Sequence, residues 1–424
     1  MLNTSPIAVL WDDSHIWGLM ALRALRDLDF PVRLLKGSDI AQGALFRKQG
    51  SAAGPAVSLL VVPGGSARLK AEGLGPEGQQ AVRDFVQAGG RYLGFCGGAG
   101  LALSHNKGLG LCPWGRASYP ERILHLISGH VRATISPSPF TPRWDSPEAS
   151  LPVWWPGRFG NVGGDVDVLA RYKAPDTDFW IADLPLSSVP SHAFRDWLAL
   201  YGVNLSADFL TSSELIVHGG YGHGEYILSY SHLETPESPQ ANQWLCRILS
   251  LFTGATLKDR DISPWNLFST PAASDSAPCG VEKAFRDMLD IMELAIEHRL
   301  FFKRTSWLTC WKPGLPGIMC NNLLASFHAA LSLPRTGEAL AFWEERRKEF
   351  TQLCGEFFPG AESYLLAARL AETLRPTMPG AIDRDSLSGT GLKVTHENLL
   401  DGTVEGMECV EDRLFTVQFH PESA

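Results

Sequence analysis

The stretch RYLGFCGGAG, residues 91–100, decides the fold. It joins a short apolar run, residues 91–95, to a cysteine that small residues follow. A strand that turns sharply into a helix at a nucleophile flanked by glycines is a nucleophile elbow. Glycines are needed there because the turn strains the backbone and brings neighbouring segments close together. The stretch therefore predicts that Cys96 is a nucleophile, with a buried structural thiol as the alternative.

The segments around this stretch alternate between strand and helix patterns. Short apolar runs end at turn residues in 6–11, 30–35 and 57–62. Apolar residues recur at helical spacing in 15–28 and 77–88. Strands that alternate with helices form a mostly parallel sheet, and chemistry in such sheets lies at the carboxyl ends of the strands. This pattern predicts an α/β domain over residues 1–255.

The rest of this domain is less regular. Residues 115–213 are rich in Trp and Pro, and antiparallel strands are expected at 166–172 and 178–184. Further strands are expected at 214–217 and 226–230, and an amphipathic helix is expected at 239–253.

The composition changes beyond residue 255. Residues 256–280 are rich in Pro, Ser and Ala and are predicted to be a linker. Residues 281–375 have helical periodicity, with helices expected at 281–302, 321–333, 337–358 and 361–374. Residues 386–424 return to strand character with a turn at Asp401-Gly402. We therefore expect an α/β domain, a helical domain and a short β-rich tail.

The composition also excludes several kinds of partner. A chain of 424 residues with 20% charged residues is expected to fold into two or three globular domains. A formal charge of -9 without a Lys/Arg run argues against a nucleic-acid partner. No apolar stretch approaches the length of a membrane span, and the N-terminus lacks a secretory signal pattern. Eight scattered cysteines without a C-x-x-C pair predict a cytoplasmic protein without a metal site.

A cysteine nucleophile needs a base and donors for an oxyanion. His232 and Glu234 follow an expected strand, where the carboxylate could orient the imidazole; a surface pair is the alternative. The N–H of Gly97 is one expected oxyanion donor, and the loop 63–65 is expected to supply the second. Asp12-Asp13 follow the first strand and are interpreted as a helix N-cap, with a place in the pocket as the alternative.

Residues 1–255 resemble class I glutamine amidotransferases, and most of all the amidotransferase-like domain at the N-terminus of biotin–protein ligases. The resemblance rests on VVPGG (61–65), RYLGFCGGAG (91–100), WWPGRF (154–159) and GHGEYILSYSHLE (222–234). It implies a flavodoxin-like fold and a triad that releases ammonia from glutamine. It also implies that the protein needs no cofactor and that a partner synthetase or ligase uses the ammonia.

The same resemblance assigns roles to individual residues. It implies that Cys96 is the nucleophile, His232 the base and Glu234 the acid that orients it. It also implies that Gly65 and Gly97 donate to the oxyanion, and we expect Gly64 and Gly98 beside them to contact the substrate.

Residues 386–424 resemble the end of the carbamoyl-phosphate synthase small subunit, through VTHENLLDGTVEG (394–406) and FHPE (419–422). This second resemblance implies that His420 is a base and Glu422 its orienting acid, in competition with His232 and Glu234. So short a tail cannot bury a core of its own and is expected to dock on the first domain or to extend from it. An evolved module and a fused or truncated reading frame both remain open.

Three functions are therefore considered. The first is a cysteine-dependent amide hydrolase that releases ammonia from glutamine for a partner protein. The second is a glutaminase related to the carbamoyl-phosphate synthase small chain. The third is a noncatalytic binding or scaffold protein that keeps the amidotransferase fold.

Overall fold

The computed structural model divides the chain into two units, Met1–Asn266 and Leu267–Ala424. It describes residues 5–47, 55–117, 127–160, 162–181, 184–202, 204, 206, 210–257, 261–271, 279–312, 315–333, 336–373, 393–397, 404–409 and 414–417. The two units are treated separately below.

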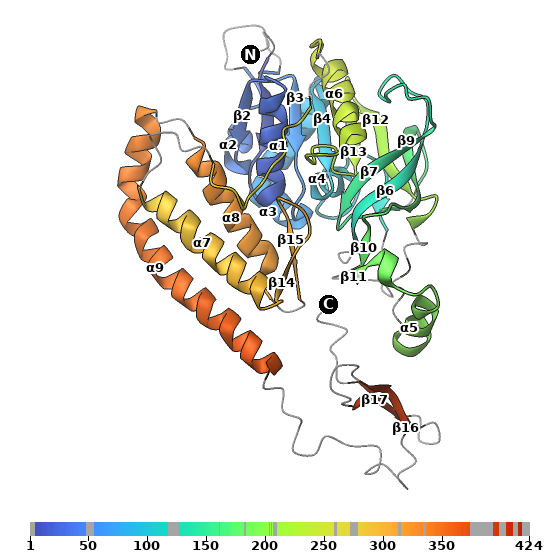
Figure 1. Ribbon diagram of the computed structural model, residues 1–424. Coiled ribbons are helices and arrows are strands. Elements are labelled where there is room, and N and C mark those ends of the chain that lie inside the picture. Colours follow the sequence, from blue (N-terminus) through green and yellow to red (C-terminus); the bar gives the residue numbers. More distant parts are fainter. Residues whose placement is uncertain are drawn as a thin grey trace. The chain divides into compact units, whose positions relative to one another are not determined.

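The first unit is built on a large mixed sheet, and one half of that sheet is parallel (Figure 1). Its strands pair in the order β2 (Val32–Leu35), β1 (Ile7–Leu10), β3 (Leu59–Val62), β4 (Arg91–Phe95) and β13 (Gly224–Ser229). This is the strand order 2-1-3-4-5 of flavodoxin-like sheets. The α/β class predicted from the sequence is confirmed.

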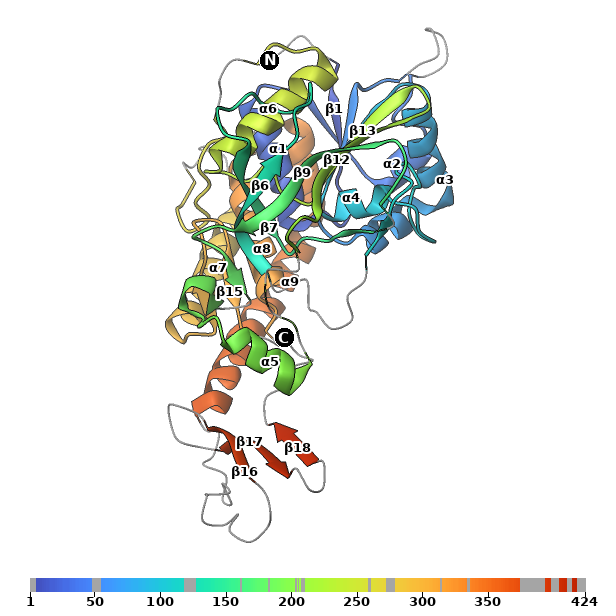
Figure 2. The same ribbon diagram turned by 90° about the vertical axis from the view of Figure 1, so that its right-hand side faces the viewer.

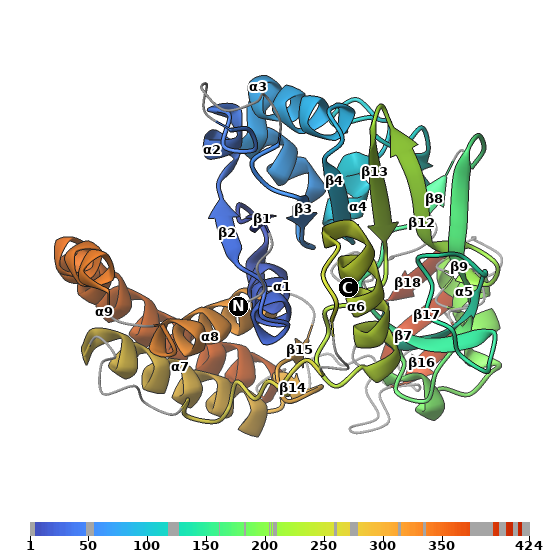
Figure 3. The same ribbon diagram turned by 90° about the horizontal axis from the view of Figure 1, so that it is seen from above.

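Helices cover both faces of the parallel half (Figure 3). α1 (His15–Asp27) and α6 (Pro239–Thr253) lie on one face, and α3 (Ala67–Gln87) lies on the other. Every residue of β1 and β3 is buried, as expected for parallel strands covered on both sides. Two short helices, α2 (Gly37–Ala41) and α4 (Gly97–Ala102), follow β2 and β4.

The other half of the sheet is antiparallel (Figure 2). It continues from β13 through β12 (Glu214–Tyr221), β9 (Val166–Pro175) and β6 (Ile127–Ile135) to β10 (Trp180–Ile181) and β11 (Leu184–Pro185), and β7 (Glu148–Trp154) also pairs with β6. The strand expected at 178–184 is therefore two short strands. The remaining elements of this unit are β5 (Gly115–Arg116), β8 (Phe159–Gly160), the 3-10 helix η2 (Leu186–Ser188) and α5 (Ala193–Tyr201).

Two helices are longer than the sequence pattern indicates. α3 begins at Ala67, whereas the periodicity predicts a helix only from residue 77. The chain kinks at Gly75, whose φ of 61° only glycine adopts readily, and Pro76 then opens the second part of the helix. α9 (Gly337–Thr373) runs through Pro359, where the sequence predicts two helices.

The second unit contains α7 (Cys279–Glu297), α8 (Gly317–Leu331) and α9, with a hairpin of β14 (Phe301–Lys303) and β15 (Thr309–Trp311) between α7 and α8. Strands β16 (Lys393–Glu397), β17 (Val404–Cys409) and β18 (Leu414–Val417) form an antiparallel sheet in the tail. Within the ranges given above, no helix has both the length and the apolar character needed to cross a membrane.

Candidate active site

Four strands of the parallel half deliver their following segments to one edge of the sheet. β1 leads into residues 12–15, β3 into residues 63–65, β4 into Cys96 and β13 into residues 230–234. Parallel strands end at the same edge, which is where open α/β sheets bind ligands. The sequence therefore folds so that the elbow, the glycine loop and the His/Glu pair converge.

Cys96 occupies a strained backbone position between β4 and α4. Its φ and ψ are 47° and -103°, in a region that residues with a side chain rarely adopt. Its N–H donates a hydrogen bond of 2.7 Å to the carbonyl of Ser229 at the end of β13, which ties the elbow to the neighbouring strand. The side chain is half-buried, and the thiol lies 3.8 Å from the Trp155 carbonyl oxygen. This geometry matches the predicted nucleophile elbow.

The glycines around the elbow allow two backbones to touch. A Cβ atom on Gly97 would lie 1.8 Å from the carbonyl oxygen of Gly65, and one on Gly98 would lie 1.9 Å from that of Val62. Gly65 itself has a φ of 106°, and a Cβ there would lie 2.0 Å from the Asp13 carbonyl oxygen. The loop after β3 therefore packs directly against the start of α4, and a larger side chain at these positions would separate them.

His232 and Glu234 form a buried pair beside this elbow. Nδ1 of His232 lies 2.8 Å from Oε1 of Glu234, and both side chains are fully buried. The ring packs on Trp17 with 4.4 Å between ring centroids, and a Cβ on Gly64 would lie 2.8 Å from Cε1 of His232. Nε2 of His232 and Oε2 of Glu234 have no hydrogen-bond partner among the described residues. One edge of the imidazole is therefore held, and the other is available for chemistry.

The charge state of His232 follows from its two polar neighbours. Burial alone would lower the pKa of this imidazole. The charge of Glu234, hydrogen bonding with Cys96 and Glu234, and the charge of Cys96 outweigh burial and raise the pKa to about 9. The imidazole of His232 is thus close enough to the Cys96 thiol to exchange a proton with it. Their contact falls outside standard hydrogen-bond geometry, because Nε2 has no hydrogen-bond partner among the described residues.

Backbone strain is concentrated around the same centre. Among the described residues other than glycine with a positive φ, Asp13, His15, Cys96 and Trp155 all border it. The Trp155 ring packs edge-on against Trp17, with 5.9 Å between centroids. Clustered strain of this kind is a feature of functional sites. Trp155 therefore belongs to the wall of the site.

Lys70 is a buried charge that the sequence analysis did not single out. It lies on α3 with no exposed surface, and its Nζ donates to the Asp12 carbonyl oxygen at 2.9 Å and to Ser14 Oγ at 2.6 Å. Burial lowers its pKa to about 7, while the charges of Asp13, Asp12 and Cys96 act in the opposite direction. Lys70 precedes the helix that the sequence pattern predicts, and lysine is ordinarily a surface residue, so the sequence carried no signal for this position.

Asp12 has a different role from the one expected. The N-cap residue of α1 is Ser14, and its side chain makes no capping hydrogen bond there. Oδ2 of Asp12 instead accepts a hydrogen bond of 2.6 Å from the N–H of Gly37, the first residue of α2. Asp12 therefore caps a helix, but one that follows the neighbouring strand.

The structure brings together the residues of the first predicted triad. Cys96, His232 and Glu234 lie at one centre, and the glycines expected to serve the oxyanion and the substrate surround it, namely Gly64, Gly65, Gly97 and Gly98. The roles of these residues remain predictions. His420 and Glu422, the competing pair, lie outside the described residues.

Comparison with known families gives two matches, at separate places in the chain. Residues 53–106, which include the loop after β3 and Cys96, match the family described as "Biotin-protein ligase, N terminal". Residues 380–424 match the family described as "Glutamine amidotransferase class-I". The resemblances stated for both ends of the sequence are thereby confirmed.

The relatives found are similar over short stretches. The carbamoyl phosphate synthase pyrimidine-specific small chain of Lactiplantibacillus plantarum is 52% identical over 44 residues, which is 10% of this chain and 12% of that protein. The carbamoyl phosphate synthase small chain of Clostridium acetobutylicum is 54% identical over 44 residues, with the same coverage. The chain thus spans 12% of the length of these relatives. Among solved structures, PurLQS from Thermotoga maritima shares 14% identity over 58% of this chain and 99% of that chain, with a TM-score of 0.39.

Proposed function

We propose that the first unit is a cysteine-dependent amide hydrolase of the glutamine amidotransferase type, which releases ammonia from the side-chain amide of glutamine. One observation carries this proposal. The imidazole of His232 is buried with Nδ1 on Glu234, and its pKa responds to the thiol of a strained cysteine. A nucleophile, its base and a third group that orients the base are the components of a catalytic triad.

The geometry supports a two-stage reaction. His232, whose pKa is raised to about 9, holds the proton of Cys96 as an imidazolium, and the sulfur attacks the carboxamide carbon to give a tetrahedral intermediate. The N–H of Gly97, at the first position of α4, has no intrahelical acceptor and would bind the oxyanion together with the N–H of Gly65. The His232 imidazolium then gives its proton to the leaving nitrogen, so ammonia departs and a thioester remains. Water, activated by His232, hydrolyses the thioester to glutamate and restores the thiol.

Ammonia released in this way needs an acceptor. We propose that a partner synthetase or ligase consumes it, as the resemblance to amidotransferases implies. The described cysteines Cys96, Cys112, Cys320 and Cys354 are free thiols, which supports a reducing, cytoplasmic location for the protein and its partner.

The proposal is tested by glutamine hydrolysis and by labelling. The wild-type chain should release ammonia from glutamine, and Cys96→Ser should not. A glutamine-analogue electrophile such as 6-diazo-5-oxo-norleucine should modify Cys96, and Cys112→Ser serves as the control because burial raises the pKa of that thiol. A folded wild type that neither turns over glutamine nor is labelled at Cys96 would leave the noncatalytic scaffold as the function.

The family match at residues 380–424 favours a second source of the base. In that case the protein is a glutaminase related to the carbamoyl-phosphate synthase small chain, with His420 and Glu422 serving Cys96. Deletion of residues 386–424 and the substitution His232→Ala separate the two arrangements. Activity that survives the deletion and vanishes in His232→Ala supports the internal base, and the opposite result supports the tail.

A further inference from the structure

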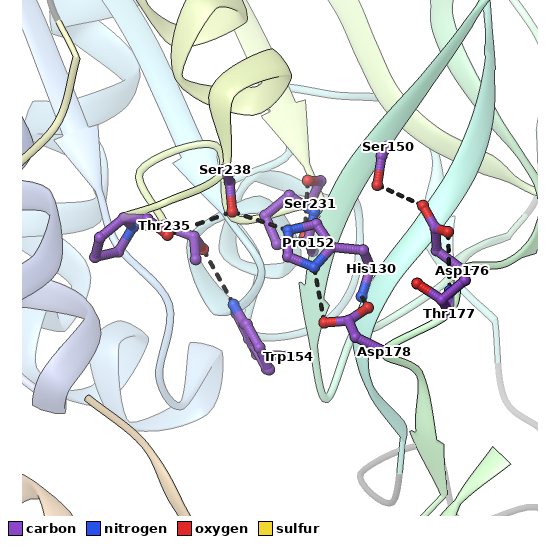
Figure 4. A network of polar contacts seen from close by, with 11 residues as sticks. His130, Ser150, Pro152, Trp154, Asp176, Thr177, Asp178, Ser231, Thr235 and Ser238 are labelled. Atoms are coloured by element: carbon purple, nitrogen blue, oxygen red, sulfur yellow. Dashed lines mark hydrogen bonds and ion pairs between the residues drawn. The ribbon is translucent and has the colours of Figure 1, made fainter. Parts of the chain in front are cut away.

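A Ser–His–Asp arrangement, separate from the Cys96 centre, lies around His130 on β6 (Figure 4). Nδ1 of His130 lies 2.9 Å from Oδ2 of Asp178, and Nε2 lies 2.9 Å from Oγ of Ser238. A carboxylate can only accept, so Nδ1 of the neutral ring carries the proton and Nε2 accepts the hydroxyl proton of Ser238. These are the relative positions of nucleophile, base and orienting acid in a serine hydrolase.

The imidazole and the carboxylate are fixed from two directions. Oδ1 of Asp178 accepts the backbone N–H of His130 at 2.8 Å, so both carboxylate oxygens bind the same residue. The N–H of Asp176 donates to the carbonyl of His130 at 2.9 Å, which fixes the Asp178 turn against β6. A base held in this way needs little rearrangement before it acts.

Ser238 has an unusual environment for the first residue of a helix. It is the N-cap residue of α6, yet its hydroxyl makes no capping hydrogen bond to that helix. A serine at this position ordinarily accepts from the first turn. Here Oγ is directed to His130, with a weaker contact of 3.5 Å to the Pro236 carbonyl oxygen. The preceding residue, Glu237, has a φ of 58°, so the hydroxyl directly follows a strained turn.

A cavity of about 370 Å³ lies beside these residues, and its lining includes all three of them. Ser238 is only 3% exposed, so a substrate would reach it through the cavity that it lines. The volume is within the range of small-molecule sites. The carboxylates of Asp176 and Glu237 also line it, which favours a cation over an anion.

We propose that Ser238, His130 and Asp178 form an esterase site for small carboxylic esters that carry a positive charge. This activity is separate from the amide hydrolysis proposed for Cys96. Ser238 Oγ attacks the ester carbon while His130 takes its proton, and the same proton leaves with the alcohol as the acyl–serine bond forms. Water then attacks the acyl–serine and gives its proton to His130, and the acid leaves as Ser238 regains its hydrogen. The N–H groups of Gln240 and Ala241, in the first turn of α6, are free of intrahelical acceptors and would bind the oxyanion.

The test uses the full chain with Cys96→Ala, so that the thiol contributes no ester chemistry. A fluorophosphonate probe followed by peptide mass spectrometry should label Ser238. Ser238→Ala should lose this label, and His130→Gln should slow it by about 100-fold or more. Ser188→Ala is the control, because the exposed hydroxyl of Ser188 donates to the Pro185 carbonyl oxygen outside this cavity. Ser238 should be labelled at the parent rate in that variant.

Two results would overturn the proposal. One is a folded Cys96→Ala protein, judged by its unfolding transition, in which Ser238 remains unlabelled. The other is labelling of Ser238 at the same rate with and without His130. The predicted charge preference has its own measurement, with 4-nitrophenyl esters whose acyl group ends in a quaternary ammonium or in a carboxylate. Hydrolysis that depends on Ser238 should be faster for the first ester, and an equal or reversed preference contradicts the proposed substrate class.

Discussion

The ammonium group of Lys70 donates a hydrogen bond of 2.6 Å to Oγ of Ser14, in the turn that follows β1. This bond places a buried lysine close enough to Cys96 for the two charges to interact. The candidate site thus contains two groups with shifted pKa values, and the shifts are opposite in direction. Burial lowers that of Lys70 to about 7, and the neighbours of His232 raise its value to about 9.

The opposite shifts predict a compensated dependence of stability on pH. Lys70 has an ordinary pKa of 10.5, so between pH 7 and 10.5 the unfolded chain binds the extra proton and stability rises with pH. His232 has an ordinary pKa of 6.5, so its contribution is fully present below pH 6.5 and is lost as pH rises through 9. Between pH 7 and 9 the two contributions oppose each other.

Lys70→Met removes the contribution of Lys70. We therefore predict that the stability of this variant falls with pH because the contribution of His232 is no longer offset. The free energy of unfolding of this variant should fall between pH 7 and 9 by up to about 1.4 kcal/mol per pH unit relative to wild type. Urea unfolding at pH 7, 8 and 9 measures it. Lys107→Met, at an exposed lysine, is the control and should follow the wild-type profile. Parallel profiles for Lys70→Met and wild type would show that folding does not lower the pKa of Lys70.

The Glu234 carboxylate is expected to set the activity of His232. In Glu234→Gln the side chain keeps its size and an oxygen acceptor but loses the charge that raises the pKa of His232. Glutaminase activity should fall by about 100-fold or more, as when an orienting acid is removed from a triad. Measuring kcat/KM against pH, with Glu282→Gln as an exposed control, checks this. Unchanged kcat/KM in Glu234→Gln would remove Glu234 from the triad.

The contact between the loop after β3 and the start of α4 predicts a difference between two glycines of one helix. Gly97→Ala forces a methyl group to within 1.8 Å of the Gly65 carbonyl oxygen. We therefore expect the free energy of unfolding to fall by at least about 2 kcal/mol and the activity to be lost. Gly100→Ala meets only the Ala67 side chain, at 3.5 Å, and should be neutral or stabilising by up to about 1 kcal/mol. Thermal unfolding and ammonia release distinguish them; equal effects would contradict the close approach.

The hydrogen bond from Gly37 to Asp12 predicts that this carboxylate stabilises α2. Asp12→Ala should lower the free energy of unfolding by about 1 kcal/mol, as expected when a helix cap is removed. Asp12→Asn retains an acceptor oxygen and should keep most of that stability. Urea unfolding of both variants provides the measurement, and an Asp12→Ala protein as stable as wild type would exclude the capping role.

Much of the fold could be predicted because glycine and proline mark the ends of its elements. The strand predicted at residues 91–95 coincides with β4, and the helix predicted at 239–253 coincides with α6. The same marks mislead at Gly75-Pro76 and Pro359, since a helix can resume after a kink or run through a proline. Local sequence does not reveal whether packing around such a residue holds two helical segments together.

The candidate site could be predicted where it depends on chain order and not where it depends on packing. Cys96 and His232 follow strands with recognisable patterns, so their shared edge of the sheet follows from topology. Lys70, Trp17 and Trp155 reach that edge through the packing of α3 and α1 and through a strained turn, and none of these has a local signature. The Ser238–His130–Asp178 arrangement joins residues from three distant parts of the sequence, so only the three-dimensional structure reveals it.

The segment from Ser231 to Ser238 supplies His232 and Glu234 at one end. At its other end it supplies the Ser238 hydroxyl, which is hydrogen-bonded to His130. Both ends are anchored, because Ser231 and His232 bond to the Pro152 carbonyl of β7 and Ser238 begins α6. A segment anchored at both ends tolerates substitutions more readily than a change in its length. Inserting or deleting one residue here would displace one arrangement or the other, so the spacing of six residues from His232 to Ser238 should be kept wherever both chemistries persist.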